Sequence, residues 1–461
     1  DDFISEAVRA TRLLTNCAIT GEAAGDGGEV PDVPRETLRK MIRGWRRGYG
    51  RTALCLSSGA TMGFYHFGTV LALAKQNSLP RLVSGTSCGA LVAAVVCSRT
   101  REEILEMVHA DQLHPHLQVF DESLWTYMKR FLMSRKVLDN SRTRDKLRAL
   151  LFGDMTFREA YEKTGRVLNI SASTSGRFGT AINLNHVTTP DVTLWSAVMA
   201  SSAVPPLMRD VSLYEVKKKF SGVGAQPRVL PADSLAQSSS RGDIPGTSAA
   251  AEREDDGSAL LTKASAPLVS SEQASDAEPF TTFGQSWKDG VILADIPSRH
   301  LSEAHHATFF VVSQVNPHVV PFLFERRGAP GAPSRMHLLH RSGLRGGFVL
   351  SALETLLKLE INKWLSILAE LNLFPDVFST DISRAFVQNT TGDVTVFPAR
   401  GWGHVIDVLA ILGNPSRQGL KFMMDHGERM TWPRLWSVRN RYVLESTLRR
   451  CEEELRNADE K

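Results

Sequence analysis

The chain has 461 residues, of which 42% are hydrophobic, a composition typical of a globular protein with one large or two ordinary domains. Its formal net charge is only +4, which gives no long-range field favouring nucleic acid, so no nucleic-acid partner is expected. Five cysteines without paired spacing suit a reducing, intracellular compartment, and no cluster of cysteines, histidines and carboxylates has metal-site spacing. We therefore expect neither a metal ion nor another cofactor.

The first 50 residues predict a helical segment. Apolar residues between Ile4 and Leu14 indicate one helix, the glycines at 21–28 indicate a linker, and Pro34 opens a second helix. Two interpretations of the second helix stay open: it packs on the core with a solvated basic face, or it docks on a phospholipid monolayer. Its apolar stripe is Leu38, Met41, Ile42 and Trp45, and the basic residues around it are Arg35, Arg39, Lys40, Arg43, Arg46 and Arg47.

Membrane contact is expected to be peripheral. The uncharged runs at 192–208 and 304–324 contain Pro, Ser, Asn or His, so they predict buried strands and turns and not membrane spans. No signal peptide is visible, and the chain begins at Asp1 without a methionine, the pattern of a fragment whose targeting segment is missing.

A strand, a turn rich in small residues and a helix follow from residue 53. Ala53–Leu56 reads as a buried strand, and a helix is expected from Phe64. Backbone N–H groups in such a turn can cradle an anion, which predicts either an oxyanion hole or a phosphate-binding loop. Neither Gly-x-Gly-x-x-Gly nor a Lys-Ser/Thr ending is present, which disfavours the phosphate-binding loop. The candidate oxyanion-hole residues are Ser58, Gly59, Ala60, Thr61, Met62 and Gly63.

A second strand-turn-helix pattern contains the candidate nucleophile. Residues 82–86 predict a short strand, Ser87 stands in a Gly-x-Ser-x-Gly sequence, and 90–97 predict a helix of small residues. A nucleophile elbow needs this layout, because its serine lies on a strained turn and Gly85 and Gly89 leave room for close backbone approach. The start of the following helix then offers free N–H groups to developing negative charge.

Downstream, helical and strand patterns continue around one long interruption. No aromatic residue occurs between Phe220 and Phe280, and Ser, Ala, Gly, Pro and charged residues dominate. Such a stretch cannot bury enough apolar surface to offset its ordering entropy, so a disordered insertion is predicted over about 221–279. Helices are predicted over 101–109, 123–132, 142–152, 344–374 and 440–456, and strands over 167–173, 307–315 and 393–398.

After the insertion, Trp287-Lys288-Asp289-Gly290 completes an arrangement of small-residue turn, Gly-x-Ser-x-Gly and Asp-Gly. This arrangement resembles the patatin-like phospholipase family. Further segments resemble its lipid-droplet triacylglycerol lipase branch, namely those at 50–54, 64–68, 95–100, 156–161 and 312–318. One departure is that most members have a glycine triplet where this chain has Ser57-Ser58-Gly59.

The resemblance implies a fold and a site. The fold would be a patatin-like α/β/α sandwich of three layers with a mainly parallel central sheet and flanking terminal helices. By the resemblance, Ser87 is the nucleophile, Asp289 of the Asp289-Gly290 pair is the base without a histidine, and residues 58–63 form the oxyanion hole. The Ser201–Pro206 segment is expected near the active site. The domain organisation is 1–50 helical, 51–315 catalytic with its insertion, and 316–461 a mainly helical extension.

The resemblance also implies an activity. The leading interpretation is a lipid acyl hydrolase, a triacylglycerol lipase that cleaves long-chain acylglycerol or phospholipid esters at a lipid-droplet or membrane surface. Within enzymes, the alternative is a phospholipase or a lysophospholipid acyltransferase. From another class, the alternative is a non-catalytic lipid-droplet surface protein that lost its oxyanion hole through Ser57 and Ser58. A Ser–His–Asp triad also stays open, since His305, His306, His318 and His404 follow Ser87.

Overall fold

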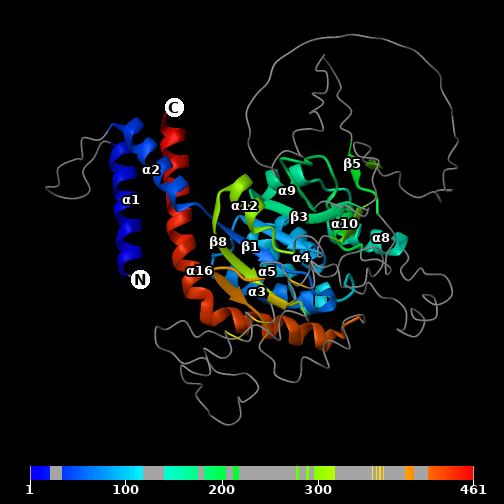
Figure 1. Ribbon diagram of the computed structural model, residues 1–461. Helices are drawn as coiled ribbons and strands as arrows, with labels where there is room; N and C mark the ends of the chain where they lie inside the picture. Colours follow the sequence, from blue (N-terminus) through cyan, green and yellow to red (C-terminus); the bar gives the residue numbers. More distant parts are fainter. Residues whose placement is uncertain are drawn as a thin grey trace, which may run out of the picture. The chain divides into compact units, whose positions relative to one another are not determined.

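The computed structural model describes most of the predicted core (Figure 1). The helix predicted at 123–132, most of the one at 344–374 and the predicted insertion up to residue 276 lie outside the described residues, while Ala277–Pro279 form strand β6. The described ranges are 2–20, 34–117, 140–174, 181–203, 211–216, 277–279, 287–289, 295–316, 390–398 and 414–459, with positions 356, 360, 363, 364 and 367.

The central sheet of the described residues is seven-stranded and mainly parallel, as expected. Its order is β4-β3-β2-β1-β8-β9, with β7 also paired to β3. The two antiparallel members, β4 and β7, both pair with β3. A separate pair is formed by β5 (Tyr214–Val216) and β6. The sheet strands are β1 (Arg51–Leu56), β2 (Leu82–Thr86), β3 (Val167–Thr174), β4 (Ala181–Asn185), β7 (Trp287–Asp289), β8 (Ala307–Ser313) and β9 (Val394–Val396).

Helices cover both faces of this sheet. Along β1, Leu54 and Leu56 join the largest hydrophobic cluster, which also takes in α3 and α4. The alternate residues Ala53 and Cys55 join a second cluster with Leu301 of α12. Because successive side chains of a strand point to opposite faces, both faces of β1 are buried, and the result is three layers. The flanking helices are η1 (Ala60–Phe64), α3 (Tyr65–Lys75), α4 (Cys88–Cys97), α5 (Arg101–Met107), α6 (Ala110–Leu113), α8 (Asn140–Leu150), α9 (Phe157–Thr164), α10 (Leu194–Ser201) and α12 (Ser298–His305).

Two sequence predictions need correction. The run at 192–208 was expected to be strand and turn, but it contains helix α10, whose residues are all buried. Periodicity cannot separate a buried helix from a buried strand, which explains the error. The C-terminal helix was expected over 440–456, but it is α16 and spans Arg417–Asp459. It begins earlier than expected because Leu420 and Met424 already bury apolar side chains.

Helix α16 joins the core to the N-terminal helices. Its first part packs closely on α3, since a Cβ on Gly68 would come 2.6 Å from the backbone nitrogen of Glu428. Pro433 lies inside α16, and Figure 1 shows the helix change direction, as expected for a residue that removes a helix hydrogen bond. Its second part packs with α1 (Asp2–Thr20) and α2 (Arg35–Tyr49) around Leu38, Ile42 and Leu448. Among the helices of the described residues, none is long and apolar enough to cross a membrane.

Candidate active site

Ser87 lies where β2 ends and α4 begins, in a conformation that few side chains adopt. Its φ is 55° and its ψ is −120°. Such backbone strain costs about 1–3 kcal/mol and persists only where neighbouring contacts hold it. Here the Ser87 N–H donates to Ser201 Oγ at 2.9 Å, and Ser201 Oγ donates to the Ser171 carbonyl at 2.6 Å. The end of α10 therefore fixes the elbow through Ser201, the first residue of the segment that was expected near the active site.

The two glycines of the elbow are required by close backbone contacts. A Cβ on Gly85 would come 2.7 Å from the Ala90 nitrogen. A Cβ on Gly89 would come 2.6 Å from the carbonyl oxygen of Ser57. Real Cβ atoms do not approach backbone this closely, so alanine at either position would displace the elbow or the turn beside it.

The predicted oxyanion turn packs directly on this elbow. A Cβ on Gly63 would come 2.6 Å from the Cβ of Cys88, the residue after Ser87. Within the turn, Gly59 and Ala60 have positive φ values of 155° and 48°. Their N–H groups have no hydrogen-bond acceptor among the described residues, whereas the Met62 N–H donates to the Gly59 carbonyl. Gly59 and Ala60 therefore carry N–H groups without an acceptor among the described residues, in the turn that packs against Cys88.

Ser57 and Ser58, noted above as a departure from the expected glycines, are part of the hydrogen bonding of the turn. Ser57 Oγ donates to the Ser58 carbonyl and accepts the Val315 N–H, both at 2.9 Å. Ser58 Oγ donates to Asn316 Oδ1 at 2.5 Å. Both side chains are buried. The hydroxyl groups therefore tie the turn to the end of β8, where a glycine could make no such bond.

Asp295 supports the same turn, a role that the sequence interpretation missed. Its Oδ1 accepts the Ser58 N–H at 2.8 Å, and its Oδ2 accepts the Asn316 amide at 2.6 Å. Burial raises the pKa of Asp295 to about 6, although the hydrogen bonds from Ser58, Gln314 and Asn316 oppose this shift. The sequence contained a signal, because a single acid inside the apolar run at 291–297 indicates a buried, hydrogen-bonded carboxylate.

His66 holds the turn from its other side. Its Nε2 lies 2.9 Å from the Ser57 carbonyl, which can only accept, so Nε2 carries the proton and Nδ1 accepts from Ser313 Oγ at 2.8 Å. Burial lowers the pKa of His66 to about 4, and the ring is neutral at ordinary pH. Thr69 lies beyond Ser313, at 3.5 Å, and Thr431 of α16 lies 3.2 Å from Thr69.

The backbone of Asp289 lies next to the elbow. Strand β3 pairs with β4 along one edge through residues 169–173. Its other edge pairs with β2 up to Ser171, opposite Thr86, and then with β7, where Ala172 is opposite Asp289. Strand β2 stops pairing with β3 after Thr86, where the chain turns at Ser87. Asp289 pairs with the next residue of β3 on the same edge, so its backbone lies beside the turn. The side chain of Asp289 and all of Gly290 lie outside the described residues.

The region that contains this turn and this elbow matches a known protein family. Residues 54–222 match the family model of the patatin-like phospholipases. The chain carries a patatin-like phospholipase domain. This domain contains the predicted turn and elbow, and its match ends before Asp289.

Relatives with the same domain extend over nearly the whole chain. A patatin-like phospholipase domain-containing protein of Cryptococcus neoformans is 33% identical over 429 residues, which are 93% of this chain and 42% of that protein. One of Coccidioides immitis is 33% identical over 449 residues, or 97% of this chain and 51% of that protein. The chain thus spans about half the length of these relatives or less. The solved structure of VipD from Legionella pneumophila covers 83% of this chain and 67% of its own, with 12% identity and a TM-score of 0.34, too distant for any inference.

Proposed function

We propose that this chain is a lipid acyl hydrolase with Ser87 as nucleophile. The observation that carries the proposal is the strained Ser87 at the start of α4, packed against a turn whose Gly59 and Ala60 N–H groups are unpaired in the described residues. Acyl transfer needs this pair of features, a nucleophile held on a rigid turn and donors placed where an oxyanion forms.

The reaction follows from these groups. Ser87 Oγ attacks the ester carbonyl and gives its proton to Asp289, whose backbone lies beside the elbow. Within the turn, the N–H groups of Ser58 and Met62 already donate to Asp295 and to the Gly59 carbonyl. As oxyanion donors we therefore propose the N–H groups of Gly59 and Ala60, together with the first N–H groups of α4. The intermediate collapses, the alcohol leaves with the proton from Asp289, and the same carboxylate activates the water that releases the fatty acid.

A histidine base is the competing mechanism, and two buried histidines do not support it. Both ring nitrogens of His66 are occupied, and burial lowers the pKa of His66 and of His305 to about 4. His306 is an exposed residue at the C-terminal end of α12, and His318 and His404 lie outside the described residues. The Ser–Asp dyad therefore stays our proposal for the base.

Triacylglycerol is the proposed substrate, and a lipid droplet or intracellular membrane the proposed site of action. The support is the resemblance of the segments at 50–54, 95–100 and 312–318 to the triacylglycerol lipase branch. Phospholipid is the second candidate, since the relatives carry the phospholipase name. Hydrolysis of triacylglycerol, diacylglycerol and phospholipid emulsions by the purified chain distinguishes the two. Faster release of fatty acid from phospholipid would overturn the triacylglycerol proposal.

Replacement of the two dyad residues tests the mechanism. Ser87→Ala should abolish labelling by a fluorophosphonate probe and lower ester hydrolysis by about 10⁴-fold or more, because the covalent intermediate cannot form. Asp289→Asn should lower hydrolysis to a similar extent, since an amide cannot take the proton. Ser98→Ala is the matched control, a buried serine at the far end of α4 that bonds the Val95 carbonyl, and it should label normally. Near-normal hydrolysis by either dyad variant would remove the assignment.

A further inference from the structure

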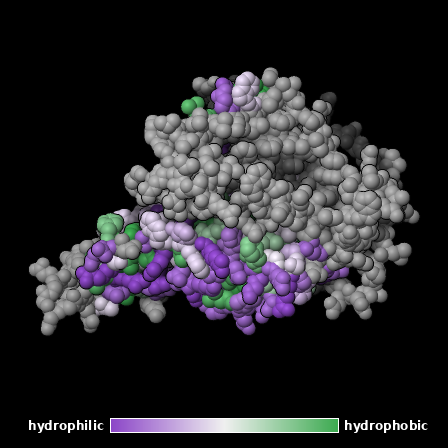
Figure 2. All heavy atoms as spheres, turned by 90° about the horizontal axis from the view of Figure 1, so that it is seen from below, coloured by the Kyte–Doolittle hydropathy of each residue, from purple (hydrophilic) through white to green (hydrophobic). Residues whose placement is uncertain are grey.

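An exposed aromatic face on α16 remains unexplained by the site. Trp432 and Trp436 lie one helical turn apart, and 54% and 65% of their surfaces are exposed. Residues four apart share a face of a helix. On the other side of this helix, Thr431 and Val438 are buried, so packing fixes which face points outward. Figure 2, the view from below Figure 1, shows mostly hydrophilic side chains with hydrophobic ones scattered among them on the described part of that side.

Unpaired cations accompany these tryptophans. Lys421, Arg429 and Arg439 are exposed residues of α16, and none has an ion-pair partner among the described residues. Two acids of α16 lie near these cations in sequence: Asp425 is exposed, and Glu428 is already paired with Lys75. Cations therefore outnumber acids around the aromatic pair, and the face suits a partner with negative charge and a partly apolar surface.

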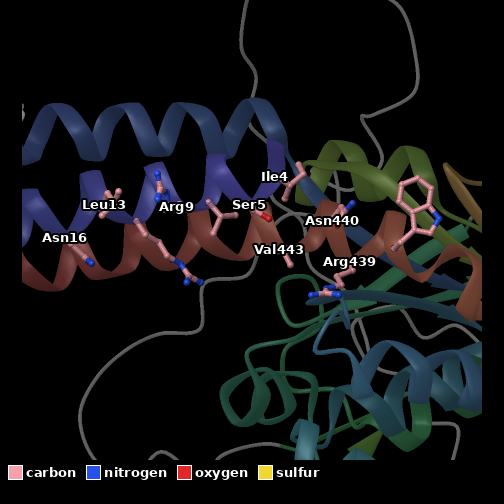
Figure 3. A pocket seen from close by; sticks show the side chains of 11 residues that line it. Ile4, Ser5, Arg9, Leu13, Asn16, Arg439, Asn440 and Val443 are labelled. Carbon is pink, nitrogen blue, oxygen red and sulfur yellow. The ribbon is translucent and has the colours of Figure 1, made fainter. Parts of the chain in front are cut away.

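A groove between α1 and α16 continues this face. Its volume is about 570 Å³, and Trp436 forms part of its wall (Figure 3). The groove combines apolar side chains with the guanidinium groups of Arg9, Arg12 and Arg439. Among the described residues, Arg9 forms an ion pair with Glu6, whereas Arg12 and Arg439 form none. The apolar lining is Ile4, Val8, Leu13 and Val443.

We propose that this face, comprising Trp432, Trp436, Arg429 and Arg439 with the adjoining groove, docks the chain on an anionic phospholipid surface. Tryptophan suits the boundary between headgroups and acyl chains, because its ring is apolar and its N–H is polar. Each cation near an anionic surface adds about 1 kcal/mol of attraction. The inference rests on the proposed function in one respect, that the ester substrate is a lipid.

Vesicle flotation tests this surface. Wild-type chain should float with vesicles of phosphatidylcholine containing phosphatidylserine, and less with phosphatidylcholine alone. The double variant Trp432→Ala, Trp436→Ala should lower the bound-to-free ratio at least tenfold on both. The double variant Arg429→Gln, Arg439→Gln should bind both kinds of vesicle equally weakly. The matched control is Trp45→Ala with Arg47→Gln, an exposed tryptophan and an exposed arginine of α2, which should float like wild type.

The outcomes separate the two proposals. Fluorophosphonate labelling of each variant reports whether Ser87 still lies in a folded site. Labelling without any vesicle binding by wild type would overturn the docking surface alone, and vesicle binding without labelling would overturn the hydrolase alone. Equal loss of flotation in the α2 control, or unchanged flotation in both α16 variants, would also overturn the docking surface.

Discussion

The elbow and helix α2 are held in place by different kinds of contact. At the elbow, backbone atoms approach so closely that no Cβ fits at Gly85 or Gly89. On α2, a Cβ at Gly44 would meet nothing within 4 Å, and the arginines form partly exposed ion pairs with α16. The backbone around Ser87 is therefore held by contacts in which one added methyl group would cause a collision. Helix α2 is instead held by an apolar stripe, so substitutions on its exposed face should be tolerated.

Gly89→Ala should have the largest effect, because its methyl group would collide with backbone atoms of both Leu56 and Ser57. The new methyl group must push away the ends of β1 and the oxyanion turn, and such overpacking costs about 1–3 kcal/mol or more of unfolding free energy. A shift of the turn by about 1 Å would lower the rate roughly 100-fold. Thermal unfolding and the fluorophosphonate labelling rate measure the two effects.

The same substitution on α2 is the control. Gly44→Ala lies in an exposed helix interior with open space for the methyl group, so it should stabilise the fold by about 0.5–1 kcal/mol. Its labelling rate should match wild type. If both glycine variants behaved alike, the contrast between the two regions would be wrong.

The elbow could be predicted from sequence because all of its signals lie within about ten residues. Strand, Gly-x-Ser-x-Gly and helix are adjacent, so local preferences and steric needs coincide. The supports of the turn are different, since Asp295 is 237 residues from Ser58 and Ser313 is 247 residues from His66. No local pattern encodes those pairs, and tertiary packing alone brings them together.

Two features of the fold leave little signal in the sequence. Helix α10 was read as strand and turn because a run that is buried on all sides has no polar face to reveal its period. The ladder of antiparallel β4 and β7 on β3 was not anticipated, since a strand of three residues such as β7 carries almost no pattern. The mainly parallel sheet was predictable because strands that are buried on both faces, such as β1, read as continuous apolar runs.

His66 sharpens the comparison, because it supports the turn through side-chain hydrogen bonds and not through close backbone packing. His66→Leu removes the hydrogen bonds to Ser57 and Ser313 and should lower kcat roughly 10- to 100-fold while KM changes little. His66→Gln should recover part of the rate, since its amide can donate to the Ser57 carbonyl. Kinetics on a soluble short-chain ester measures both, and equal rates for wild type and His66→Leu would contradict the role.

The acid sensitivity of His66 gives an independent measurement. Its pKa falls from 6.5 to about 4 on folding, because burial disfavours the charged ring. As the pH falls, the unfolded chain therefore takes up the proton first, and the contribution to stability is complete above pH 6.5 and lost progressively toward pH 4. The His66→Leu variant should lack this part of the acid destabilisation, which urea unfolding at several pH values would detect.

The double variant Arg39→Gln, Arg43→Gln of α2 should have the smallest effect on the unfolding free energy. Arg39 pairs with Asp459 at 2.6 Å and Arg43 with Glu452 at 3.1 Å, and both pairs are partly exposed. Such pairs contribute at most about 1 kcal/mol each, so unfolding free energy should fall only slightly, whereas Leu38→Ala in the buried stripe should cost about 2–5 kcal/mol.

The same double variant decides between the two interpretations of the basic face of α2. Because Arg39 and Arg43 are already neutralised by acids of α16, their removal should leave flotation with anionic vesicles unchanged. Docking by α2 would instead predict a loss of binding that grows with the phosphatidylserine content of the vesicles. A loss as large as that of the Trp432→Ala, Trp436→Ala variant would make α2 part of the lipid-binding surface, and the separation between a structural α2 and a docking α16 would fail.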